Sequence, residues 1–353
     1  MLMRSTIDTL LMLMRAGLWE MEGRLSVLDV TNLKDVHQLA EEQSVVGLIA
    51  AGLEHVKEKV PQEVALTFAG SALQLEQRNK SMNEYVAWLI ERLREEDIYA
   101  LLVKGQGIAQ CFERPLWRAA GDIDLLFSEV NYEKAKAFLL PLSSCNKNEE
   151  RYSQHLGMNI DSWYVEIHGT LRTGLSSRVD KVIDKTQDNV FLEGAVRSWK
   201  NGDTQVFLPS PDNDVFFVFT HFIKHFYKEG MTLRQICDWC RLLWTFRDTI
   251  NKSLLVERLR SAGLMSEWRS FASLAVNYLG MPTDAMPLFE KKECWHRKAK
   301  QIINLILCGY KHNALLDSFA IAKIFPGNTI RFLPSILLNV NGLKIQERLF
   351  GRK

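Results

Sequence analysis

Cysteine is scarce in this chain, and long apolar runs are missing from it. Six cysteines in 353 residues, spaced as they are, indicate no disulfide framework, which is typical of a reducing compartment. The longest uncharged apolar runs, such as Val45–Leu53 and Ile302–Cys308, fall far short of the ~20 residues that cross a bilayer. Asp8 interrupts the apolar start Met1–Leu18, which predicts an amphipathic helix rather than a signal peptide. We therefore expect a cytoplasmic protein without a membrane span.

The chain as a whole also has no large excess of charge of one sign. Its net charge is +2, with 47% hydrophobic and 24% charged residues, and these globular values exclude disordered and low-complexity classes. The stretch from Glu290 to Lys353 differs, with twelve Lys or Arg residues against four Asp or Glu. Such a stretch either attracts phosphates or nucleic acid, or neutralises the acidic remainder of the protein.

The spacing of apolar residues divides the chain into three parts. Over residues 1–95, and again over 206–353, apolar side chains recur at spacings of three and four, which predicts helices. Residues 96–205 instead contain short apolar runs bounded by turn signals, which are typical of strands. The clearest predicted strands are Ile98–Val103, Asp122–Phe127, Met158–Ile160 and Trp163–Ile167. We therefore expect an α+β fold, in which a small mixed β-sheet core is flanked by N-terminal and C-terminal helical domains.

Two aspartates alternate along one predicted strand, within Gly121–Leu126. Because alternate side chains of a strand point to one face, Asp122 and Asp124 project together while the apolar residues between them enter the core. Two carboxylates side by side repel each other and need a cation, which suits a hard divalent metal such as Mg²⁺. Glu166 shares a face with His168 on a later strand, and it completes an acidic triad if the two strands are neighbours.

A glycine turn precedes the aspartate pair. The segment Lys104–Gly107 follows a predicted strand and opens a helix, so backbone N–H groups and the positive helix end can face a phosphate. Lys104 adds a mobile positive charge. The turn is a weak signal alone, but the Asp-x-Asp motif that begins seventeen residues after Gly105 makes it much stronger.

Further residues on both sides of the aspartate pair complete a pattern that carries a family resemblance. Its residues are Leu102–Gly105, Pro115, Arg118, Gly121–Leu126, Glu166–His168, Leu208–Asp212, His221, Leu233–Arg234 and Asp238. Over about Leu101 to Leu243, the chain resembles the uncharacterised bacterial nucleotidyltransferase family of the polymerase-β-like nucleotidyltransferase superfamily. The superfamily turn is usually Gly-Ser or Gly-Gly, whereas Gln106 follows Gly105 here.

The resemblance implies transfer of a nucleoside monophosphate from an NTP, by default ATP, to an acceptor hydroxyl. Two Mg²⁺ ions would bridge the nucleotide phosphates and activate the acceptor. The implied catalytic and metal-binding residues are Asp122, Asp124 and Glu166. The implied phosphate-binding residues are Lys104, Gly105, Gly107 and Arg118. The acceptor is open between a small molecule, a protein and RNA, and we expect the C-terminal helices to form the wall beside it.

Several residues of this region also have a simpler interpretation. Arg118 could form a structural ion pair with a nearby aspartate, and Lys104 could be a surface lysine. His168 is more typical of a packed histidine than of a metal ligand. A zinc site is conceivable where two histidines precede two cysteines on predicted helices, although buried cysteines explain the same pattern equally well. That group is His221, His225, Cys237 and Cys240.

Two other functions compete with nucleotidyl transfer. One is an Asp-x-Asp glycosyltransferase that uses a nucleotide sugar, but such enzymes usually begin with an α/β region, and the first 95 residues here predict helices. The other is a catalytically idle nucleotide-binding or regulatory protein of the same fold. The presence of all three carboxylates argues against the idle protein, and Mg²⁺-dependent nucleotide binding would separate it from an enzyme.

Overall fold

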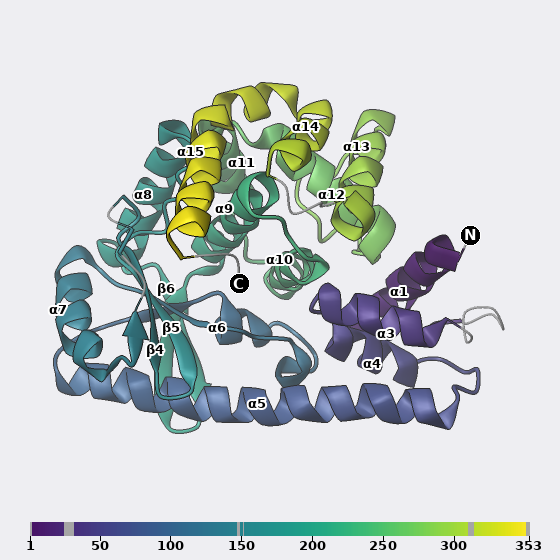
Figure 1. Ribbon diagram of the computed structural model, residues 1–353, viewed down its shortest axis with the longest axis horizontal. Helices are drawn as coiled ribbons and strands as arrows, with labels where there is room; N and C mark the ends of the chain where they lie inside the picture. Colours follow the sequence, from purple (N-terminus) through teal and green to yellow (C-terminus); the bar gives the residue numbers. More distant parts are fainter. Residues whose placement is uncertain (1, 25–31, 147–148, 151, 310–313, 351–353) are drawn as a thin grey trace.

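The N-terminal part of the chain is a group of short helices joined to one very long helix (Figure 1). The computed structural model describes residues 2–24, 32–146, 149–150, 152–309 and 314–350. The short helices α1 (Leu2–Trp19), α3 (Leu33–Glu42) and α4 (Val46–Glu54) pack on one another. Helix α5 (Gln62–Glu95) follows Pro61 and, with 34 residues, is roughly 50 Å long. It runs beneath both the short helices and the sheet.

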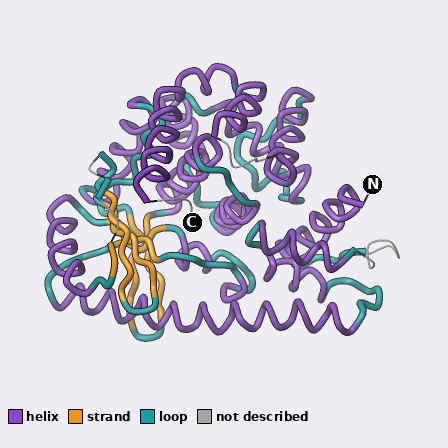
Figure 2. The backbone as a smooth tube through the Cα atoms, viewed as in Figure 1, coloured by secondary structure: helices purple, strands orange, loops and turns teal. Residues whose placement is uncertain are grey.

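Within the described residues, seven strands form one mixed sheet, which gathers at one end of α5 (Figure 2). Their order is β3-β4-β5-β2-β1-β7-β6. Strand β2 lies antiparallel to β1 and parallel to β5, while β1 lies parallel to β7. The strands are β1 (Leu101–Val103), β2 (Ile123–Leu126), β3 (Cys145–Asn146), β4 (His155–Ile160), β5 (Trp163–His168), β6 (Val196–Asn201) and β7 (Thr204–Pro209).

Helices α5 and α7 (Glu129–Leu139) cover one face of the sheet. Buried side chains from the C-terminal half of α5 and from α7, among them Leu89 and Tyr132, belong to the same apolar cluster as Ile123 and Leu125 of β2. Because side chains alternate along a strand, Asp124 points to the opposite face. That opposite face carries the aspartate beside apolar side chains such as Leu126, which belong to the other buried cluster.

The remaining helices of the C-terminal part surround α9, which lies at their centre (Figure 1). Twelve of its eighteen residues are buried, so α9 carries apolar side chains on nearly all sides. The helices after β2, besides α7, are α8 (Ser177–Phe191), α9 (Pro211–Lys228), α10 (Leu233–Thr245), α11 (Lys252–Ala262), α12 (Met265–Leu279), α13 (Glu293–Asn304), α14 (Ala314–Ile324) and α15 (Pro326–Phe350).

The N-terminal and C-terminal helices share one apolar core. Side chains of α1, α4, α9, α10 and α12 belong to a single buried cluster. Polar contacts cross the same interface: the Trp19 indole donates to the Leu279 carbonyl at 2.6 Å, and the Arg241 guanidinium donates to the Leu18 carbonyl at 3.0 Å. The first helix is therefore anchored on residues more than 200 positions away.

The predicted α+β fold, with a mixed sheet flanked by helices, is confirmed. The sheet extends beyond Ile167, however, since it also contains β6 and β7. The sequence pattern did not predict these two strands or the helix α8. The division of the chain at residues 95/96 and 205/206 stays a prediction. In the part of the chain that the structure describes, no helix is both long enough and apolar enough to cross a membrane.

Candidate active site

Three carboxylates converge on the face of the sheet opposite to α5 and α7. Asp124 on β2 lies opposite Glu166 on β5 in parallel register, as expected if the two strands are neighbours. Asp122 immediately precedes β2. One oxygen from each of the three side chains lies within 4.8 Å of the others. This all-oxygen donor set fits a hard divalent cation such as Mg²⁺.

The two aspartates are neutralised to different extents. The charge of Asp124, together with burial, raises the pKa of Asp122. Burial alone would raise the pKa of Asp124 as well, but the Lys104 ammonium and a hydrogen bond with His168 hold it well below its usual range. The Asp122 carboxylate therefore feels the repulsion that a bound cation would relieve.

Lys104 follows β1 in a backbone conformation that few residues other than glycine adopt. Its φ is 58° and its ψ is −143°, close to a region that is essentially restricted to glycine. From this position Nζ donates to Oδ1 of Asp124 at 2.7 Å. Burial alone would lower the pKa of Lys104, but Asp124 and Glu166 raise it, so the ammonium stays charged. The strained turn places this cation against the carboxylates.

Gln106, which follows Gly105 in this turn, ties the turn to helix α5. Its side-chain nitrogen donates to Oδ1 of Asn79 at 3.2 Å, and the Asn79 amide donates to the Leu116 and Arg118 carbonyls. Gly107 is buried, and a Cβ there would lie 2.6 Å from Cδ2 of Leu208. This contact explains the glycine by packing, while its role in phosphate binding stays a prediction.

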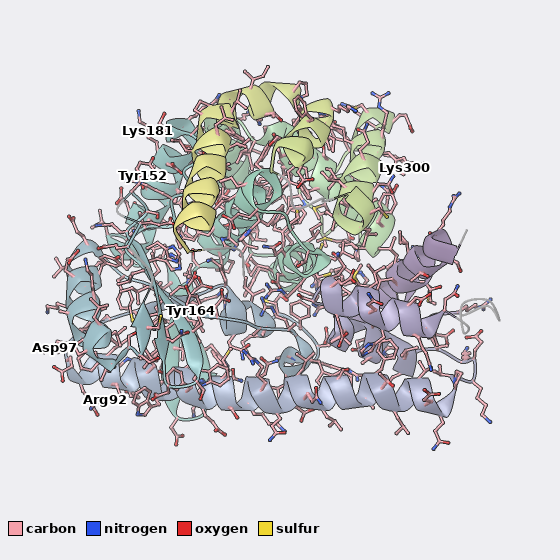
Figure 3. The ribbon with its side chains drawn as sticks, viewed as in Figure 1. Arg92, Asp97, Tyr152, Tyr164, Lys181 and Lys300 are labelled. Atoms are coloured by element: carbon pink, nitrogen blue, oxygen red, sulfur yellow. The ribbon has the colours of Figure 1, made fainter. Side chains whose placement is uncertain are left out.

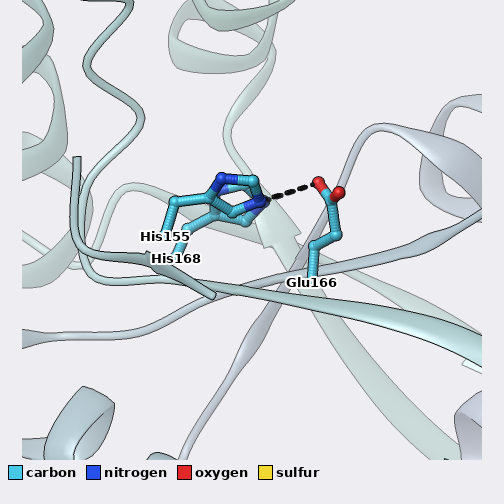
Figure 4. A group of neighbouring side chains, drawn as sticks. All are labelled: His155, Glu166 and His168. Atoms are coloured by element: carbon cyan, nitrogen blue, oxygen red, sulfur yellow. Dashed lines mark ion pairs between the residues drawn. The ribbon is translucent and has the colours of Figure 1, made fainter. Parts of the chain in front are cut away.

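Two histidines stack beside the carboxylates (Figure 4). His155 on β4 pairs with His168 on β5, and their rings are nearly parallel with centroids 4.7 Å apart. Nε2 of His155 lies 3.1 Å from Oε2 of Glu166, and Nε2 of His168 lies 2.8 Å from Oδ1 of Asp124. Burial would lower the pKa of His155, but Glu150 and Glu166 raise it to about 9. His155 is therefore a cation that neutralises Glu166.

His168 differs from its stacked neighbour. Burial lowers its pKa, so its ring is neutral and donates to Asp124. His168 also belongs, with His155 and Glu166, to a second group of donor atoms within 4.8 Å of one another. Its contact with Asp124 agrees with the interpretation of a packed histidine that supports the site.

Arg118 lies beside the site but already has partners within the protein. Its Nε and Nη2 each lie 2.7 Å from a carboxylate oxygen of Asp238 on α10, and Nη1 donates to the Ala119 carbonyl. Both side chains of this ion pair are buried. Arg118 thus joins the loop before β2 to α10, as the simpler interpretation stated, and its binding of phosphate stays a prediction.

A cavity of about 360 Å³ opens in front of the carboxylates. That volume is in the range of sites for small molecules. The sheet and the Lys104–Gly105 turn form one side, and α9 and α10 form the other, as expected for the C-terminal wall. The charged and histidine side chains on the helical side are Asp214, His221, Lys224, His225, Glu229, Arg234 and Asp238.

Arg234 is a further cation of this wall, and it is among the residues that carry the family resemblance but was not predicted to bind phosphate. It donates to the Ala119 carbonyl at 3.1 Å, and no ion pair with a carboxylate is present for it among the described residues. Its buried Nε has no hydrogen-bond partner there. Its position in the sequence was the available signal. Arg234 lies one helical turn before Asp238, so both residues share the face of α10 that contacts Arg118 beside the site.

The histidines and cysteines of the zinc hypothesis do not come together. His221 and His225 line the cavity, whereas Cys237 and Cys240 are fully buried in the apolar core. Sγ of Cys237 lies 3.8 Å from Sδ of Met14. In the described ranges, the groups that could hold a metal are the two on the sheet, and they contain none of these four side chains.

Among the residues that the structure describes, none from the basic C-terminal stretch lines the cavity. Lys291, Lys292, Arg297 and Lys298 lie on or just before α13, and none of them is among the lining residues. Figure 3 labels Lys300 of α13 and Tyr164 of β5, which are well separated across the molecule. An attraction of phosphates by these four side chains would therefore act outside the cavity.

An α+β fold whose sheet presents Asp-x-Asp beside a third carboxylate is the arrangement of a nucleotidyltransferase. The family model described as "Uncharacterised nucleotidyltransferase" matches residues 29–280, and the chain belongs to that family. No curated protein matches the chain. One solved structure, an antigenic nucleotidyltransferase-like protein from Paracoccidioides brasiliensis, is 12% identical over 52% of this chain and 90% of that chain, with a TM-score of 0.32. A likeness of that size carries no weight for the fold or the function.

Proposed function

We propose that the protein transfers a nucleoside monophosphate from an NTP, with ATP as the default, to an acceptor hydroxyl in a Mg²⁺-dependent reaction. The observation that carries this proposal is the convergence of Asp122, Asp124 and Glu166 in a cavity of a nucleotidyltransferase-family protein. These three side chains would hold two Mg²⁺ ions. When bound, the ions supply Lewis-acid stabilisation of the attacking and leaving oxygens.

The cations of the cavity would bind the nucleotide phosphates. Lys104 lines the cavity beside the carboxylates, and Gly105 contributes backbone with a φ of +38° at the same turn. Arg234 faces them from α10 with a buried Nε that lacks a partner among the described residues. In this arrangement the phosphates lie between the sheet and the C-terminal helices, so the acceptor approaches along the wall of α9 and α10.

The test is to incubate the protein with each α-labelled NTP, Mg²⁺ and a cell extract. We expect one fraction of the extract to become labelled, and the labelling to disappear with EDTA or with the Asp122→Asn variant. Mg²⁺-dependent NTP binding without any labelled fraction would instead identify an idle nucleotide-binding protein. Labelling from a nucleotide sugar in place of an NTP would point to a glycosyltransferase.

A further inference from the structure

Three side chains of α9 outside the carboxylate trio form a hydrogen-bonded chain along the cavity. His221, His225 and Glu229 are spaced four residues apart and therefore share one side of the helix. Nε2 of His225 lies 3.0 Å from Nε2 of His221, and Nδ1 of His225 lies 2.9 Å from Oε2 of Glu229. All three line the cavity that holds the carboxylates.

The hydrogen-bonding chemistry of these three side chains determines where their protons lie. A carboxylate accepts hydrogen bonds and donates none, so Nδ1 of His225 carries a proton toward Glu229. In neutral His225 the lone pair is then on Nε2, which accepts from the Nε2–H of His221. Neutral His221 is left with its lone pair on Nδ1, and this atom has no hydrogen-bond partner in the described part of the chain.

Burial and the charges around the three side chains favour this distribution of protons. Burial, followed by the nearby Lys104 ammonium, holds the pKa of His221 well below its usual range, so the ring is neutral. Burial would raise the pKa of Glu229, but the hydrogen bond and charge interaction with His225, followed by the charge of Lys224, lower it to about 2. His221 and Lys104 line the same cavity, and Lys104 bonds to Asp124, so His221 lies at the site.

We propose that His221 is the base that takes the proton of the acceptor hydroxyl, an inference that rests on the proposed nucleotidyl transfer. The acceptor oxygen forms a bond to the α-phosphorus, and the hydroxyl proton moves to Nδ1 of His221. The bond from the α-phosphorus to the bridging oxygen breaks, and pyrophosphate leaves with the electron pair. The proton on Nε2 of His221 passes to His225, whose positive charge is stabilised by Glu229, as in a catalytic triad.

The experiment compares His221→Asn and Glu229→Gln with His296→Asn, a control on α13 whose side chain does not line the cavity. Label transfer from α-labelled ATP into a cell extract should fall by about 100-fold or more in His221→Asn and by about tenfold in Glu229→Gln, with no change in the control. Affinity for the unreactive analogue α,β-methylene-ATP with Mg²⁺ should stay within about threefold in all variants.

A second readout does not depend on activity. ¹⁵N NMR of the wild-type imidazoles at neutral pH should show neutral His221 with its proton on Nε2, and it decides the assignment if His221→Asn fails to fold. A proton on Nδ1 of His221, or label transfer by folded His221→Asn within about threefold of wild type, overturns the inference and leaves the proposed function standing. Wild-type protein that neither binds the analogue with Mg²⁺ nor labels the extract contradicts the proposed function itself, and the inference falls with it.

Discussion

The behaviour of the site at the residue scale depends on how two neighbouring aspartates are neutralised. Asp124 shares Oδ1 between Lys104 and His168, whereas Asp122 has no ion pair among the described residues. Removal of the negative charge should therefore affect the free energy of unfolding differently at Asp122 and at Asp124. Asp124 contributes to the stability of the fold through these two contacts, whereas Asp122 is repelled by the charge of Asp124.

We predict that Asp122→Asn and Asp124→Asn both abolish transfer but differ in stability. Asp122→Asn removes repulsion, so the free energy of unfolding of the metal-free protein should be unchanged or higher by up to about 1 kcal/mol. Asp124→Asn leaves a buried ammonium without its carboxylate, and the free energy of unfolding should fall by about 1–3 kcal/mol. Denaturant titration in EDTA measures both, and an equal effect of the two variants would contradict this account.

His155 predicts how stability changes with pH. Its pKa is raised to about 9, so the folded protein keeps a proton that the unfolded chain loses near pH 6.5. The resulting stabilisation is fully present below pH 6.5 and is lost as the pH rises through 9, by at most about 3 kcal/mol. Unfolding in EDTA across this range should show the decline in wild type and a flatter curve in His155→Gln. Parallel curves would contradict the prediction.

At the scale of elements, the ion pair between Arg118 and Asp238 joins the loop before β2 to α10. It connects the sheet to the opposite wall of the cavity, so it determines how far the two sides stand apart. Gln106 and Asn79 fasten the preceding turn to α5 in a similar way. The cavity is thus defined by polar contacts between elements that are distant in sequence.

We predict that Asp238→Ala lowers the free energy of unfolding by about 3–5 kcal/mol, because it leaves the buried Arg118 cation without its partner. The double variant Arg118→Met/Asp238→Leu should recover most of that loss, since apolar side chains of similar size avoid the buried charge. Denaturant titration of the three proteins is the measurement. A double variant as unstable as Asp238→Ala would show that the pair is needed for its geometry.

The same scale shows what the sequence could and could not predict. The alternation within Gly121–Leu126 and at Glu166 correctly indicated two strands with carboxylates on one face, because a period of two is a local property. The hairpin of β6 and β7 also had a local signal, since Gly202 and Asp203 form a two-residue turn between alternating residues. The pairing of Arg118 with Asp238 spans 120 positions, and no local pattern could distinguish it from a free arginine facing a phosphate.

At the scale of the whole molecule, the shared core of the first and last helices is the main feature. Leu13 of α1 is fully buried in the cluster that also contains Trp268 and Phe271 of α12. Helices that share a core gain stability from the same contacts. The two helical parts should therefore unfold together, although the spacing of apolar residues divides the sequence into three parts.

We predict that Leu13→Ala destabilises α12 as much as α1. The cavity left by the lost side chain should reduce the free energy of unfolding by about 2–5 kcal/mol. Hydrogen exchange should report equal increases for the slowest amides of both helices. Faster exchange confined to α1, with α12 unchanged, would show that the N-terminal helices unfold independently.

The strained Lys104 turn has a thermodynamic consequence for ligand binding. A divalent ion that ligates Asp124 competes with the Lys104 ammonium for the same oxygen, and the phosphates of an NTP offer that ammonium a replacement partner. Metal and nucleotide should then bind with positive coupling, each raising the affinity of the other by the same factor. In Lys104→Ala, calorimetry should find tighter Mg²⁺ binding without nucleotide, weaker NTP binding and a smaller coupling factor. An unchanged factor would mean that the lysine and the metal do not compete, whereas a smaller one would make Lys104 the residue through which the protein resists metal until a nucleotide is bound.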